Sequence, residues 1–191
     1  MLLQLVVDKC CYSNVASGRY SSVTGGFINV ASEFSSSISF GKFSSVTGGI
    51  YNRATNSFAS VSGGYSNEAS EYASSVTGGR LNSATYSYSS VSGGKSNVAS
   101  GQFSSISGGE ENVASGKFSS IIGGHSNVAS AEYSSVTGGN NNRATGGYAS
   151  VSGGQNNEAS VDASSISGGY SNVASGSKSS VTGGWKFKCC L

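Results

Sequence analysis

One fifteen-residue unit repeats along most of this chain, and it constrains the fold more than any other feature. Residues 104–118 show it clearly as Ser-Ser-Ile-Ser-Gly-Gly-Glu-Glu-Asn-Val-Ala-Ser-Gly-Lys-Phe. The first glycine of its Gly-Gly pair stands at Gly48, Gly63, Gly78, Gly93, Gly108, Gly123, Gly138, Gly153, Gly168 and Gly183. A fixed period this short is typical of a solenoid, in which each repeat is one rung that cannot fold alone.

Each unit divides into two short segments whose side chains alternate as in a β-strand. Residues 110–116 show the first segment, x-x-Asn-x-Ala-Ser/Thr-x, and residues 117–124 the second, x-aromatic-Ser-Ser-Val/Ile-Ser/Thr-Gly-Gly. Because alternate residues of a strand face opposite sides, the alanine and the valine or isoleucine should point inward and the flanking Ser and Thr outward. Such a core is thin, so the two sheets must lie close together. Outward residues fifteen apart, such as Arg53 and Glu68, should lie on adjacent rungs.

The turns between the segments complete the predicted coil. The Gly-Gly pair supplies one corner, since glycine turns tightly without steric cost. The recurring asparagines, such as Asn97 and Asn112, should lie at the other corner, where stacked amide side chains can form a ladder. We therefore predict an all-β fold: a single β-solenoid, drawn as a two-sided β-roll with about fifteen residues per coil and roughly twelve coils. A three-sided coil stays open as an alternative, and the handedness does not follow from the sequence.

The repeats occupy residues 10–184, and the chain differs from them at both ends. Residues 1–9 are the most apolar stretch and form either a hydrophobic cap or a strand that docks onto another copy. The residues that would form this docking strand are Leu2, Leu3, Leu5, Val6 and Val7. Residues 185–191 form a C-terminal cap that ends in a cysteine pair. Between Gly25 and Gly48 the spacing is 23 residues, seven short of two units, which predicts a truncated or distorted coil.

Composition argues against several classes of protein. Only 10% of the 191 residues are charged, and the formal net charge of +2 is too small and scattered for nucleic-acid binding. Gly and Ser enrichment could indicate a flexible linker, but the strict spacing of valine, alanine and asparagine argues against disorder. No apolar run is long enough to span a membrane, and the first residues make a poor signal peptide. Localisation therefore stays open.

No catalytic or metal-binding constellation stands out. His125 is the single histidine and occupies a variable corner position, and aspartate occurs only at Asp8 and Asp162. The cysteines form two adjacent pairs, which lack the spacing of zinc ligands. We therefore expect no enzyme activity and no cofactor.

The cysteines instead suggest assembly. They stand at opposite ends of the repeats, at Cys10, Cys11, Cys189 and Cys190. The rod is too long for one copy to join its own ends, because a disulfide requires its two Cα atoms to lie within roughly 7 Å. Adjacent cysteines bridge each other poorly. Two outcomes remain: free thiols in a rod with capped ends, or disulfides between the tail of one copy and the head of the next.

The Ser and Thr residues on either side of each inward valine suggest a different function. They should form two columns of hydroxyl groups on one flat face. The face includes Ser45, Thr47, Ser75, Thr77, Ser135, Thr137, Ser180 and Thr182. Such a regular hydroxyl grid is similar to an ice-binding face. However, serine outnumbers threonine and Ile122 interrupts the columns, so the small residues could equally allow sheets to pack side by side in a fibre.

A column of aromatic residues precedes each Ser-Ser pair. It consists of Phe43, Phe58, Tyr88, Phe103, Phe118, Tyr133 and Tyr148. The aromatic residue is replaced at Ala73, where Tyr72 is adjacent, and again at Ala163 and Lys178. We expect the rings to stack along one corner of the solenoid, and a lateral interface between protomers is the functional alternative.

The unit closely resembles bacterial fibre and adhesin repeats of the form Ser-x-Val-Gly-Gly-x-x-Asn-x-Ala-Ser-Gly, over roughly residues 10–184. Trimeric autotransporter heads, which are left-handed β-rolls, are more distantly similar. Grass ice-binding proteins with x-x-Asn-x-Val-x-Gly repeats resemble its first half. The first resemblance implies a structural protein, extracellular or on the cell surface, that assembles with itself into fibres or an appendage. The last implies the alternative, an ice-binding protein whose partner is the ice surface.

Overall fold

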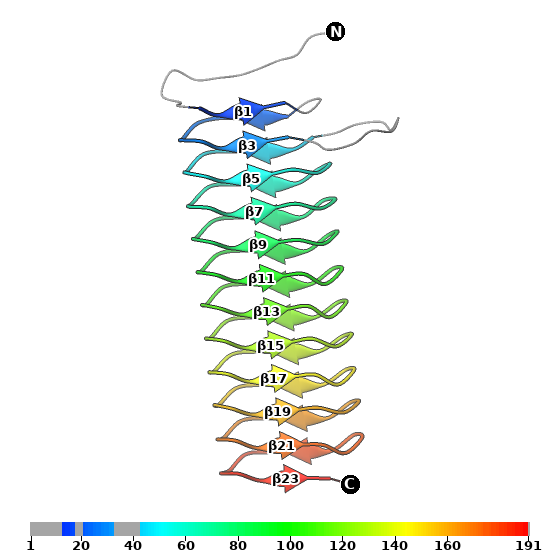
Figure 1. Ribbon diagram of the computed structural model, residues 1–191. Coiled ribbons are helices and arrows are strands. Elements are labelled where there is room, and N and C mark those ends of the chain that lie inside the picture. Colours follow the sequence, from blue (N-terminus) through cyan, green and yellow to red (C-terminus); the bar gives the residue numbers. More distant parts are fainter. Residues whose placement is uncertain (1–12, 18–20, 33–42, 191) are drawn as a thin grey trace.

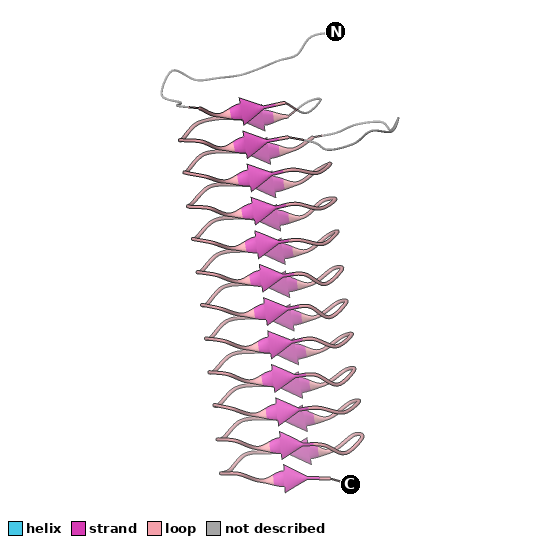
Figure 2. Ribbon diagram, viewed as in Figure 1, coloured by secondary structure: helices cyan, strands magenta, loops and turns pink. Residues whose placement is uncertain are grey.

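The chain folds into a β-solenoid, as the repeat predicts. The computed structural model describes residues 13–17, 21–32 and 43–190, and these contain β-strands and turns but no helix. Two parallel sheets run the length of a straight rod, and the chain passes from one sheet to the other and back in every turn of about fifteen residues (Figures 1 and 2). The solenoid has about eleven turns and two sides, so the two-sided coil is confirmed.

Every strand in the described part of the chain is two residues long. The first sheet consists of β1 (Val15–Ala16), β3 (Val30–Ala31), β5 (Arg53–Ala54), β7 (Glu68–Ala69), β9 (Ser83–Ala84), β11 (Val98–Ala99), β13 (Val113–Ala114), β15 (Val128–Ala129), β17 (Arg143–Ala144), β19 (Glu158–Ala159), β21 (Val173–Ala174) and β23 (Lys188–Cys189). The second sheet consists of β2 (Ser22–Val23), β4 (Ser45–Val46), β6 (Ser60–Val61), β8 (Ser75–Val76), β10 (Ser90–Val91), β12 (Ser105–Ile106), β14 (Ser120–Ile121), β16 (Ser135–Val136), β18 (Ser150–Val151), β20 (Ser165–Ile166) and β22 (Ser180–Val181).

The core consists of the two predicted columns of small apolar side chains. Ala99 of the first sheet is fully buried and pairs with Ala114, fifteen residues later, while Val91 of the second sheet is buried and pairs with Ile106. A third inward column was not predicted. It contains the first serine of each Ser-Ser pair, such as Ser89, whose hydroxyl group donates a hydrogen bond to the Tyr86 carbonyl at 2.6 Å. This local bond satisfies a polar group that would otherwise destabilise the core.

The asparagines of successive turns form a buried ladder of hydrogen bonds. Asn112 is fully buried, and its Nδ2 donates hydrogen bonds to the carbonyl of Gly108 at 3.1 Å and to that of Gly124, one turn further on, at 3.0 Å. Its Oδ1 accepts a hydrogen bond from the backbone N–H of Asn127 at 3.0 Å. The asparagines therefore lie at the Gly-Gly corner. The prediction that they occupy the opposite corner was wrong, because each amide bridges glycine carbonyl groups of two adjacent turns.

Only the second glycine of each pair is needed for the turn. Gly109 has φ +86°, and a Cβ atom there would lie 2.2 Å from the carbonyl oxygen of Gly124 and 2.5 Å from the Asn112 amide nitrogen. A Cβ atom on Gly108 would meet nothing within 4 Å. The second glycine thus allows successive turns to approach closely, while the first is not required sterically.

The irregular spacing near the N-terminus is an insertion. Ser22 pairs directly with Ser45, and Val30 pairs with Arg53, each 23 residues later. A single turn therefore holds eight more residues than the usual fifteen, so the prediction of a truncated coil was wrong. The extra length falls between Ser32 and Phe43, in a segment outside the described residues.

Candidate binding and assembly surfaces

The predicted hydroxyl face is formed by the second sheet. Its strands pair in register, so that Ser75 lies between Ser60 and Ser90 on the neighbouring turns. The threonine column is exposed and the serine column is half-buried, apart from Ser180, which is exposed. All eight predicted residues lie on this face: Ser45, Thr47, Ser75, Thr77, Ser135, Thr137, Ser180 and Thr182. Ile122 occupies the threonine column and is 60% exposed, so the hydroxyl array is interrupted as predicted.

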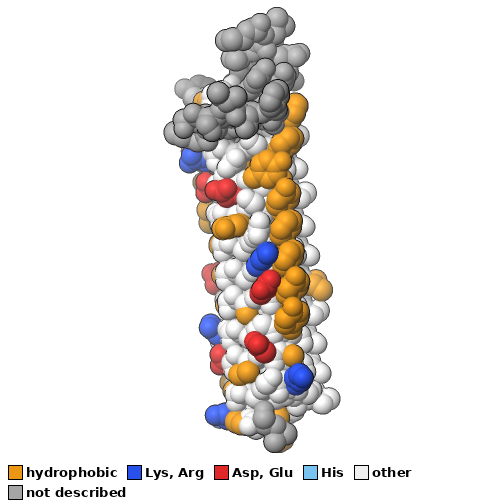
Figure 3. All heavy atoms as spheres, turned by 90° about the vertical axis from the view of Figure 1, so that its right-hand side faces the viewer, with side chains coloured by type: hydrophobic (Ala, Val, Ile, Leu, Met, Phe, Trp, Pro, Cys, Tyr) orange, Lys and Arg blue, Asp and Glu red, His pale blue; other side chains and the backbone are white. Residues whose placement is uncertain are grey.

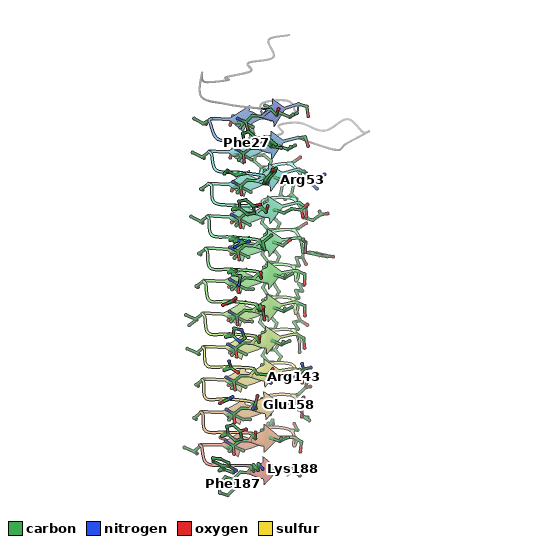
Figure 4. All side chains as sticks on the ribbon, turned by 60° about the vertical axis from the view of Figure 1, so that its left-hand side comes forward. Phe27, Arg53, Arg143, Glu158, Phe187 and Lys188 are labelled. Carbon is green, nitrogen blue, oxygen red and sulfur yellow. The ribbon has the colours of Figure 1, made fainter. Side chains whose placement is uncertain are left out.

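Charged side chains fifteen residues apart lie on adjacent turns. Arg53 pairs in register with Glu68, as expected, and Arg143 with Glu158, where the Nε to Oε1 distance is 3.8 Å (Figure 4). Lys95 donates a hydrogen bond to the Glu110 carboxylate at the Gly-Gly corner. This hydrogen bond, followed by the attraction of the same ammonium group, lowers the pKa of Glu110. Because these pairs are exposed, they contribute little to the stability of the rod. They do show that residues fifteen apart in the sequence are neighbours on adjacent turns.

Aromatic side chains form a continuous stripe along the other corner (Figure 3). The aromatic stripe consists of Phe43, Phe58, Tyr72, Tyr88, Phe103, Phe118, Tyr133 and Tyr148. From Tyr88 to Tyr148 the rings stack nearly parallel, with centroids 4.8 to 5.0 Å apart. Tyr72 fills the position left by Ala73 and contacts the rings on both sides edge-on. The predicted stacking is confirmed from Tyr88 to Tyr148, where the ring faces cover each other and the ring edges face solvent.

The backbone under the stripe is left-handed. Phe103 has φ +58° and Tyr148 has φ +56°, a region that bulky side chains seldom occupy. The Gly-Gly corner has residues of the same backbone conformation, such as Leu81 with φ +57° and Ser96 with φ +55°, yet its side chains vary in type from turn to turn. The turn therefore does not itself require an aromatic residue.

Among the described residues, no further turn packs on the sheet edge of the last turn. In the preceding turn, backbone N–H groups donate to the next turn, for example from Val173 to the Phe187 carbonyl at 2.7 Å and from Ser175 to the Cys189 carbonyl at 2.8 Å. The corresponding N–H groups of the last turn have no acceptor among the described residues. They belong to Ser180, Thr182, Trp185, Lys188 and Cys190. Trp185 and Phe187 belong to this last turn and are 68% and 59% exposed. Figure 4 shows Phe187 at this end of the rod.

The two C-terminal cysteines differ in their surroundings. Cys189 pairs in register with Ala174 and is half-buried against the core, whereas Cys190 is exposed. The Sγ of Cys190 lies 3.1 Å from the Ser175 hydroxyl oxygen. Both are free thiols. The fifteen-residue spacing from Ala174 to Cys189 was the sequence signal that could have distinguished them.

The remaining predicted assembly residues, Cys10, Cys11, Leu2, Leu3, Leu5, Val6 and Val7, lie outside the described residues.

Within the described ranges, no group of three or more His, Cys, Asp or Glu side chains is placed to hold a metal ion. The same residues include no helix of the length and apolarity needed to cross a membrane. Comparison of the sequence with known protein families and with curated proteins found no match.

Proposed function

We propose that this protein is a structural rod that assembles head to tail into fibres or an extracellular appendage. The observation that carries this function is the uncovered edge of the C-terminal turn, with its row of N–H donors and the exposed rings of Trp185 and Phe187. Unpaired strand edges bind further strands, and an edge in the solenoid's own register fits the first turn of another copy. Because head and tail are different surfaces, the contact does not close on itself and generates a filament.

Disulfide bonds between copies would make this contact covalent. Cys190 presents an exposed thiol at the tail edge, and Cys11 stands two residues before the first described turn at the head. Two thiols lose two protons and two electrons when they join, and an oxidised disulfide such as glutathione disulfide accepts them. Eleven turns spaced ~4.8 Å apart make a rod on the order of 55 Å long, so the bond must join different copies.

Electrophoresis without reductant tests the covalent link. After exposure to glutathione disulfide, we expect a ladder of multimers that collapses on reduction. Cys190→Ser should remove most of the ladder, because it removes the exposed thiol. Cys189→Ser should preserve it, because that side chain packs against the core. A single monomer band from the wild-type chain under these conditions would eliminate the covalent link.

A second candidate function, ice binding, is favoured by the exposed threonine column of the second sheet. Thr77 and Thr137 are exposed on a flat parallel sheet, where rungs repeat at ~4.8 Å. If this face binds ice, Thr77→Lys together with Thr137→Lys should abolish the shaping of ice crystals without affecting folding. The matched control is Glu68→Lys on the first sheet, which should retain the activity. Normal ice growth in concentrated wild-type protein would exclude this function.

A further inference from the structure

We infer that the aromatic stripe is the contact surface for a second copy of this chain, packed side by side and antiparallel. This lateral contact is separate from the end-to-end contact of the proposed fibre. It accounts for three features of the structure: the exposed apolar area of the stripe, the recurrence of aromatic residues at a left-handed backbone position, and the charges beside it.

The stripe exposes more apolar surface than a monomer ordinarily does. Seven of its eight rings are between 41% and 66% exposed. Since an aromatic side chain offers roughly 150–250 Å², the stripe exposes on the order of 700 Å². The largest apolar patch of a typical monomer is about 300–600 Å², and a stable interface buries about 800 Å² on each partner. One stripe packed against another therefore provides an interface of ordinary size.

The choice of residues at the stripe, rather than the backbone itself, supports a binding role for the rings. A bulky residue with positive φ destabilises a turn by roughly 1–3 kcal/mol, and both corners of the solenoid share this conformation. At the Gly-Gly corner the position holds side chains as different as Leu81, Glu111 and Asn141. The stripe nevertheless uses aromatic residues in turn after turn. Stacking between rings offsets part of the strain, but it also produces the apolar edge that solvent would otherwise contact.

The orientation and spacing of the exposed rings indicate which partner fits the stripe. From Phe103 to Tyr133 each ring has a stacked neighbour on both of its faces, so a planar ligand or sugar ring cannot stack on these rings. What remains is a straight ridge of ring edges with one ring per turn. A second ridge with the same spacing matches it along its whole length, and a copy of this chain provides that spacing.

Charges beside the stripe select the antiparallel orientation. Charged side chains lie along the stripe in Figure 3. When two stripes align antiparallel about their centre, Tyr88 lies opposite Phe103, and the turn of Phe118 lies opposite the turn of Ala73. Lys117, whose Nζ is 5.0 Å from the Phe118 ring centroid, then faces Glu71 of the other copy. The two-fold symmetry produces this pair twice.

The parallel orientation forms no such pair. Its two-fold axis runs along the rod, so the charges that flank one side of the stripe in Figure 3 would lie across the stripe from those of the other copy. Within the described part of the chain, neither Lys117 nor Glu71 forms an ion pair that a partner would have to displace.

Sedimentation of the full chain in reductant tests this contact. Reductant removes the covalent part of the end-to-end contact. Strand addition at the ends gives an open series of polymers, whereas a two-fold contact closes at two chains, so sedimentation distinguishes the two contacts. We expect the wild-type chain to dimerise. Phe103→Asn with Phe118→Asn should weaken the dimer at least about tenfold, because each stripe loses two rings near its centre while asparagine tolerates the left-handed backbone. The matched control, Tyr51→Asn with Leu81→Asn, alters exposed residues of the same backbone conformation at the other corner and should leave the dimer unchanged.

Charge reversal tests the orientation. Glu71→Lys and Lys117→Glu should each weaken the dimer roughly threefold or more, and the double variant should restore it, because the pair is re-formed with opposite signs. A wild-type chain that remains monomeric at about 0.5 mM would overturn the lateral contact. A dimer that both single reversals leave unchanged would overturn the antiparallel arrangement.

Discussion

Replacing Asn112 with leucine is expected to destabilise the solenoid by about 3–5 kcal/mol, since each buried polar group left without a partner costs about 1–3 kcal/mol. Leucine has a similar volume but leaves the Gly108 carbonyl and the Asn127 N–H without their partner, while the Gly124 carbonyl keeps the Glu110 N–H as a donor. The defect lies in the middle of the rod and interrupts the ladder that links every turn to the next.

Urea denaturation followed by circular dichroism measures this effect. The matched control is Asn140→Leu, because Asn140 is an exposed asparagine of the same corner whose Nδ2 lies 3.2 Å from Nδ1 of the exposed His125. Its replacement should change stability by no more than about 0.5 kcal/mol. Equal effects of the two substitutions would mean that the buried ladder does not stabilise the fold.

Replacing Gly109 with alanine is expected to cost about 3 kcal/mol or more, because backbone strain and steric overlap add. An alanine Cβ would lie 2.2 Å from a backbone oxygen of the next turn, which cannot move without separating the two turns. It would also press on the Asn112 amide and disturb the asparagine ladder. The fixed spacing of the turns therefore leaves no room for a side chain at Gly109.

The neighbouring glycine provides the control for this prediction. Gly108 has open space around its Cβ position, so Gly108→Ala should shift stability by at most about 1 kcal/mol in either direction. Thermal and urea unfolding of the two single variants give the comparison. A Gly108 variant as unstable as the Gly109 variant would contradict the assignment of distinct roles within the pair.

The periodicity of the sequence was sufficient to predict the architecture. A fixed period places residue i beside residue i+15 in parallel strands, and alternation then assigns the alanine and valine columns to the core. Both features are confirmed, as in the pairing of Ala99 with Ala114. The stacking of the aromatic column follows from the same register.

Three other features of the fold could be established only from the structure: the inward serines, the corner of the asparagines and the origin of the 23-residue spacing. The inward serine column was missed because serine is usually exposed, although alanine takes its place at Ala59 and Ala149 and could have indicated burial. The corner of the asparagines could not be fixed from sequence, since an amide can satisfy backbone groups at either turn. The 23-residue spacing fits both a deletion from two turns and an insertion into one, and only the pairing of Ser22 with Ser45 distinguishes them.

The candidate surfaces were predictable in position but not in detail. The hydroxyl columns lie on one sheet face as expected, and the cysteine pair lies at the end of the rod. Sequence reasoning did not separate the half-buried Cys189 from the exposed Cys190, nor did it show that Tyr72 bridges the gap in the aromatic column. Each of these depends on where a side chain points at a corner or an end, where the regular alternation stops.

Electron microscopy of the purified 191-residue chain, with and without reductant, tests the assembly of the rod most directly. Head-to-tail assembly predicts unbranched filaments many times longer than the roughly 55 Å of one rod, and Cys190→Ser should shorten them under oxidising conditions. Isolated rods of about 55 Å at high protein concentration, unchanged by glutathione disulfide, would contradict it.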